Sequence, residues 1–102
     1  MIDKMKQLYD LQKKGKELQK ELKSTEIEAS GAAGQIVAIF NAEMHLKSIK
    51  IDPSLLVGSR QNDLQGELHK ALNEGLVKAQ TVAAAKAKDL MGGLGLNIPG
   101  LG

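Results

Sequence analysis

Lysines recur every seven residues near the start of the chain, and this spacing is the clearest chemical pattern in the sequence. These lysines are Lys6, Lys13 and Lys20. On an α-helix, residues seven apart lie on one face, about 10.5 Å apart along the axis. Lys16 and Lys23 fall beside this row. The result is a basic strip that suits a phosphate backbone, because ammonium groups neutralise phosphates without reading sequence.

An apolar seam lies on the opposite side of the same segment and predicts a helix over residues 1–23. The segment contains no proline, and its seam positions alternate in spacing between three and four: Leu8, Leu11, Gly15, Leu18 and Leu22. This is a coiled-coil pattern, with Leu8, Gly15 and Leu22 at heptad position a and the recurrent lysines at f. Since a glycine inside a helix costs about 1 kcal/mol, we expect another backbone to approach closely at Gly15.

Ordinary helix stabilisation is an alternative explanation for the lysines. The acidic residues Asp3, Asp10 and Glu17 share heptad position c. Asp10 with Lys13, or Glu17 with Lys20, has the three-residue spacing of a supporting ion pair. The grouping of the two signs on separate strips leaves one strip that suits a polyanion, and from periodicity alone both explanations stay open.

A second basic region lies near the end of a later helical segment. We predict that Lys78, Lys86 and Lys88 add to the nucleic-acid surface. Cations near a helix C-terminus also complement the helix dipole, so this signal has a structural explanation as well.

Catalytic and metal sites are not indicated by the sequence. His45 and His69 stand apart from any second histidine at ligand spacing, and the chain has no cysteine. The glycine-rich end lacks the Lys-Ser/Thr ending of a phosphate loop. We therefore predict no enzyme activity, catalytic residue, metal, cofactor or small-molecule substrate.

Between the helical segments, the pattern changes to that of β-strands. Residues 25–29 alternate in polarity, residues 36–40 are apolar on both faces, and a third strand is expected from about 44 to 51. We expect a two-residue hairpin turn at Asn41-Ala42. A long helix then runs from about Asn62 to Met91.

The chain is predicted to form one domain over residues 1–91, followed by a flexible tail over 92–102. The tail contains five glycines and a proline. No signal peptide or membrane span is indicated, so we expect a cytoplasmic protein without membrane association.

A domain of this length has a thin core, and the two-faced apolar strand needs cover from a second subunit. We therefore predict a homodimer. Its interface is expected at six apolar residues: Ile36, Val37, Ile39, Phe40, Leu64 and Leu68.

Three stretches of sequence closely resemble the YbaB/EbfC family of nucleoid-associated proteins. They are KSTEIEASG at 23–31, IKIDPSLL at 49–56 and MGGLGL at 91–96. The resemblance implies an α/β subunit of the α+β type, with a long N-terminal helix, a three-stranded antiparallel sheet and a long C-terminal helix. It also implies a tweezer-like homodimer in the nucleoid that binds double-stranded DNA through basic, projecting helices, with a role in nucleoid organisation and gene regulation. The chain departs from the family pattern at Asn41-Ala42, where Asn-Gly is usual, and at the nearly neutral stretch 60–63.

A coiled-coil protein-interaction or chaperone-like module is the alternative interpretation, because two long helices beside a small β layer also suit a client-binding protein. A basic outer strip favours DNA, whereas an apolar inner surface on the helices favours a protein client.

Overall fold

The computed structural model describes residues 2–93, so the predicted tail falls almost entirely outside the described residues. A long helix, α1 (Ile2–Ser24), precedes three strands in the sequence, and a second long helix, α2 (Gln61–Gly93), follows them. The strands are β1 (Glu26–Gly31), β2 (Ile36–Asn41) and β3 (Leu46–Ile51). Short 3₁₀ turns occupy Ala32–Gly34, Pro53–Leu55 and Gly58–Arg60. The predicted α+β fold and its order of elements are confirmed, and α2 continues two residues past the predicted boundary at Met91.

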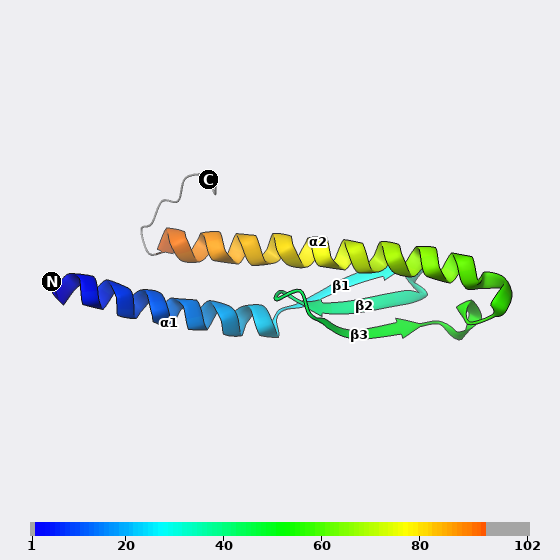
Figure 1. Cartoon of the computed structure of the whole chain (residues 1–102), viewed down its shortest axis with the longest axis horizontal. Coiled ribbons are helices and arrows are strands. Elements are labelled where there is room, and N and C mark those ends of the chain that lie inside the picture. The colour runs from blue at the N-terminus through cyan, green and yellow to red at the C-terminus, as the bar shows by residue number, and fades with distance from the viewer. Residues whose placement is uncertain (1, 94–102) are drawn as a thin grey trace.

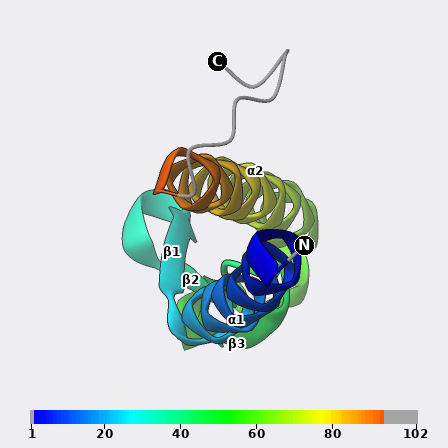
Figure 2. The same cartoon turned by 90° about the vertical axis from the view of Figure 1, so that its left-hand side faces the viewer.

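The chain forms a long rod, with principal extents of 68 × 24 × 14 Å. The sheet lies under one half of α2, and α1 lies beside the other half (Figure 1). The view along the rod shows α1 and α2 as two separate helical columns (Figure 2). The two helices therefore form a pair of arms that extend beyond the sheet.

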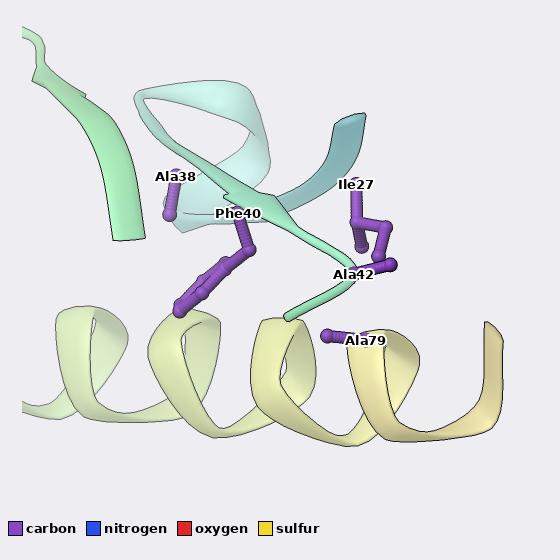
Figure 3. Close-up of a cluster of buried hydrophobic side chains, with 5 residues drawn as sticks. All are labelled: Ile27, Ala38, Phe40, Ala42 and Ala79. Atoms are coloured by element: carbon purple, nitrogen blue, oxygen red, sulfur yellow. The ribbon is translucent and has the colours of Figure 1, made fainter. Parts of the chain in front are cut away.

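The sheet has the order β1-β2-β3, with both neighbouring pairs antiparallel. α2 packs against β1 and β2. Alternate residues of β2 point toward it, and Ile36, Ala38 and Phe40 are buried. Phe40 lies over α2 in the same cluster as Ile27, Ala42 and Ala79 (Figure 3). Small residues on α2 thus let the helix approach the sheet closely.

Gly75 is the residue of α2 that receives the Phe40 ring. A Cβ atom added at Gly75 would lie 2.2 Å from Cε2 of Phe40, well inside van der Waals contact. The absence of a side chain at this position is therefore a packing requirement of the core.

The β2–β3 hairpin differs from the predicted two-residue turn. The N–H of Met44 donates to the carbonyl of Asn41 at 3.0 Å, and the N–H of Asn41 donates to the carbonyl of His45 at 2.9 Å. Three residues, 42–44, lie between the hydrogen-bonded Asn41 and His45, and Met44 is in the left-handed region at φ 68°. β3 consequently begins at Leu46 rather than near Met44. The prediction of a two-residue turn was wrong, because the loop is closed by the Asn41 side chain and not by a glycine next to it. The Asn41 Oδ1 accepts the N–H groups of Glu43 and His45.

The β1–β2 connection is tied to α2 by a carboxylate. The Glu67 Oε2 accepts the N–H of Ala32 at 2.8 Å. Ala32 and Ala33 both have positive φ, at 50° and 55°. A left-handed conformation costs an alanine roughly 1–2 kcal/mol, so the bond from Glu67 holds a strained turn in place.

The 3₁₀ turn at Pro53–Leu55 follows β3. Asp52 caps this turn, and Pro53 occupies its first position. The Asp52 carboxylate accepts the Ser54 N–H at 2.9 Å. Hydrogen bonds from the backbone and the side chain of Ser54 lower the pKa of Asp52. The sheet ends here, because Pro53 has no N–H to donate to a strand ladder.

Candidate nucleic-acid interface

The end of α1 is anchored to the sheet and to α2. Leu22 packs against the core cluster, and its carbonyl accepts the N–H of Ala42 at 3.0 Å. Farther along the arm, the Lys86 ammonium donates to the Glu21 carboxylate at 2.6 Å. These contacts orient α1 so that its leucine seam turns toward α2 and its lysine strip turns away.

The five lysines predicted on α1 lie together on its outward side, which we call the outer face. Its lysines are Lys6, Lys13, Lys16, Lys20 and Lys23. All five are exposed, and none has an ion-pair partner among residues 2–93. At about 1.5 Å per residue the row spans roughly 25 Å. An unpaired row of this length can follow a phosphate backbone.

Two of the three lysines predicted on α2 are occupied by contacts within the chain. Lys78 pairs with Glu74 at 3.0 Å and also donates to the Glu28 carbonyl at 3.2 Å. Lys86, only 26% exposed at its side chain, pairs with Glu21. Neither lysine therefore belongs to an unpaired row like that of α1. Lys88 is exposed and has no ion-pair partner within the described residues.

The space between the arms carries more acid than base. A hollow of about 280 Å³ lies there between α1 and α2. Its charged lining residues are Lys14, Glu17, Glu21, Lys86 and Asp89. Three carboxylates against two ammonium groups leave this hollow without the positive charge that would attract a polyanion.

The leucine seam of α1 is covered over only part of its length. Leu18 lines the hollow together with Leu90, near the end of α2. Leu11 and Leu8, two and three turns farther along, are 38% and 64% exposed. Among residues 2–93 the close backbone approach expected at Gly15 is not found, since no atom outside its own stretch of helix backbone lies within 4 Å of a Cβ built there.

Within residues 2–93, no three His, Cys, Asp or Glu side chains gather as metal ligands do. Neither α1 nor α2 is long and apolar enough to cross a membrane.

Comparison with known proteins identifies the family. The YbaB/EbfC DNA-binding family matches residues 1–94. The chain belongs to this family. A nucleoid-associated protein of Afipia carboxidovorans is 39% identical over 98 residues, which cover 96% of this chain and 91% of the relative. One of Dictyoglomus thermophilum is 35% identical over 100 residues, covering 98% and 95% of the two chains.

The YbaB/EbfC fold is also seen in a solved structure. An uncharacterized protein from Helicobacter pylori superimposes with a TM-score of 0.76 at 25% sequence identity. The match covers 82% of this chain and 88% of the other. Membership in a DNA-binding family assigns DNA as a partner and places the chain outside the enzymes.

The predicted dimer residues of this YbaB/EbfC chain fall into three groups. Ile36 and Phe40 are buried at 0% and 3% exposure by α2 of the same chain, so they need no second subunit. Leu64 and Leu68 are partly buried against a cluster of Ile36, Leu55 and Ala71.

Val37 and Ile39 form the third group, on the face of the sheet opposite α2. Both are half-buried. Their cross-strand neighbours are polar: Ser30 and Lys50 beside Val37, and Glu28 and Ser48 beside Ile39. This polar surround makes them a weak interface on their own.

A different apolar surface was missed by sequence analysis, and we call it the β3 patch. Its residues are Leu46, Ile49 and Leu76, which are 48%, 39% and 38% exposed. Ile49 pairs with Ala38, so it points to the side of the sheet that α2 occupies. α2 packs on β1 and β2 and leaves this edge open. The sequence shows the apolar residues Ile49 and Ile51 alternating with polar neighbours, but it does not show where α2 lies over the sheet.

Proposed function

We propose that the chain binds double-stranded DNA as a homodimer, largely through the lysines of the outer face, and takes part in nucleoid organisation and gene regulation. The observation that carries the proposal is the row of five exposed lysines without ion-pair partners among residues 2–93. The family is a DNA-binding one, and several relatives are named nucleoid-associated proteins. A nucleoid location in the cytoplasm follows from this function.

Binding through lysine strips predicts a strong dependence on salt and a weak dependence on sequence. If Lys6, Lys13 and Lys20 face phosphates in both subunits, the dimer engages on the order of six phosphates. Log affinity then falls with log salt at a slope of roughly −5. Because phosphate contacts carry little sequence information, unrelated duplexes should bind within about tenfold of one another.

The test compares two triple variants that remove the same charge. Lys6, Lys13 and Lys20 are changed to Gln in one variant, and Lys14, Lys78 and Lys86 are changed to Gln in the other. The second set is already paired with Glu17, Glu74 and Glu21. Gel shifts at several salt concentrations should show more than tenfold weaker binding and a flatter slope for the first variant. Equal losses in both variants would show that net charge, rather than the outer face, governs binding.

The β3 patch is the proposed dimer interface. Leu46 and Leu76 flank the buried Phe40, because Leu46 is its β3 neighbour and Leu76 follows Gly75. Exposed aliphatic side chains in one contiguous patch are typical of surfaces that a second subunit covers. The β3 patch replaces Ile36 and Phe40 in the proposed interface, because both are already buried beneath α2.

Light scattering after size exclusion tests this interface and should give twice the 10.9 kDa mass of one chain. Ile49→Glu should yield monomers, because it would bury an unpaired charge in the interface. Val77→Glu is the matched control, since Val77 is 60% exposed and lies on the side of α2 away from the sheet. A monomeric parent protein, or a dimer that survives Ile49→Glu, would contradict the proposal.

The protein-interaction module is retained as a second candidate because of Leu8 and Leu11. Their exposure on the seam side of α1 suits a partner helix. If the outer-face lysine variant binds DNA as tightly as the parent, this candidate becomes the better one.

A further inference from the structure

An aromatic side chain stands among the lysines of the outer face. Tyr9 is the one tyrosine of the chain and is 67% exposed. It lies three residues after Lys6, four before Lys13 and seven before Lys16, so all four share one strip of the helix. Tyr9, Gln12, Lys13 and Lys16 line a shallow hollow of about 140 Å³. The ring therefore belongs to the lysine surface and not to the core.

We propose that Tyr9 is a DNA-contact residue whose hydroxyl donates a hydrogen bond to a backbone phosphate next to the phosphates held by Lys13 and Lys16. The inference rests on the proposed function and adds an uncharged contact to the same surface. Tyrosine is among the side chains that bind DNA phosphates. Its hydroxyl reaches about as far from the helix axis as a lysine ammonium, so a strand within reach of Lys13 is within reach of Tyr9.

The conformational cost of this contact is small. A tyrosine side chain has two rotatable angles to fix, fewer than a lysine. Its ring is amphipathic, with an apolar body and a polar tip, and such rings favour surfaces that become covered on binding. Met5, four residues earlier on the same side, is 73% exposed. A duplex lying along the lysines would cover both side chains.

A hydrogen bond from an uncharged donor has a signature that separates it from the lysine contacts. Affinity depends on the bond, but the salt slope does not, because no counterion is released when a neutral group binds a phosphate. Removing Tyr9's hydroxyl should therefore lower affinity by a constant factor at every salt concentration. Removing a lysine charge should also flatten the slope.

The experiment uses the full chain with an arbitrary duplex and compares the parent with Tyr9→Phe, which keeps the ring and loses the hydroxyl. Gln7→Ala is the matched control, since it removes an exposed polar group of α1 on the seam side. The triple Gln variant of Lys6, Lys13 and Lys20 reports on the proposed function itself. Because the chain has no Trp, tyrosine emission of the parent comes from Tyr9 alone and gives a second, direct readout.

We expect Tyr9→Phe to bind about three- to tenfold more weakly than the parent with an unchanged slope. Gln7→Ala should bind as the parent does, and duplex should quench the parent's tyrosine emission. A loss of less than threefold, a flatter slope, or emission unaffected by duplex would overturn the role of Tyr9. If these results come with a weakened lysine variant, the proposed function stands without Tyr9. If the lysine variant also binds normally, both proposals fall.

Discussion

Replacing Gly75 with alanine should destabilise the fold, although alanine is the better helix former. The new Cβ would lie 2.2 Å from Cε2, 2.5 Å from Cδ2 and 3.1 Å from Cζ of Phe40. Carbon atoms normally approach no closer than about 3.5 Å, so the ring must retreat by more than 1 Å. Phe40 is 3% exposed and packed among Ile27, Ala38 and Ala79, which leaves no room for that movement.

The expected magnitude follows from two opposing effects. Overpacking of a well-filled core costs about 1–3 kcal/mol, and a shift of this size belongs at the upper end. The gain in helix propensity returns about 1 kcal/mol. The net loss is therefore about 2 kcal/mol, or roughly 8–16 °C in melting temperature for a domain of this size.

The matched control is Gly66→Ala on the same helix. Gly66 is exposed, and within the described part of the chain no atom outside its own stretch of helix backbone lies within 4 Å of a Cβ built there. This change should raise stability by up to about 1 kcal/mol. Both variants are measured by urea and thermal denaturation at one protein concentration, since the midpoint of an oligomer depends on it. If the Gly75→Ala variant is as stable as the Gly66→Ala variant, the packing argument is refuted.

A double variant connects the loss to the named ring. Phe40→Leu shortens the side chain that meets the new methyl group, so Gly75→Ala should cost less in its presence than in the parent. Residues in direct contact typically show coupling energies of about 0.5–3 kcal/mol. If the losses of stability from Phe40→Leu and Gly75→Ala simply add, the strain does not arise between the new methyl group and the Phe40 ring.

Two further changes test the turn and the tail. Met44→Asn should raise the free energy of unfolding by about 0.5 kcal/mol, because asparagine tolerates the left-handed region that Met44 occupies, whereas Met44→Val should lower it by about 1 kcal/mol; urea denaturation measures both. Ending the chain after Gly93 should leave melting temperature and dimer mass nearly unchanged, since residues 94–102 are rich in glycine and their burial would not offset their ordering entropy of about 1 kcal/mol or more per residue. A large loss of stability would show that Leu94, Leu96 or Ile98 packs against the domain.

Local patterns were sufficient to predict the elements of this protein. The alternating three- and four-residue spacing of the α1 leucines predicted a helix with one apolar side, and the same periodicity placed Lys6, Lys13 and Lys20 opposite it. Hydrophobic periodicity is a property of neighbouring residues, so it is read directly from sequence. The outer face, which depends on one helix, was predicted correctly as an exposed row.

Contacts between distant residues were beyond the reach of such patterns. Glu21 and Lys86 are 65 positions apart, and nothing near either residue indicates that they pair. Lys86 therefore looked free in sequence. Likewise, the apolar side of Ile36 and Phe40 looked available for a second subunit, because the sequence does not show that α2 lies across β2.

Features that depend on neighbouring residues could be predicted from the sequence, whereas features that depend on residues far apart in the chain could not. Which side of α1 is basic and which is apolar was determined by the sequence, since helix geometry alone arranges those side chains. Which lysines remain unpaired, why Gly75 must lack a side chain and where the apolar surface stays open were decided by the tertiary structure. Each depends on where α2 comes to rest over the sheet, and that position is set by the combined packing of α2 against β1 and β2.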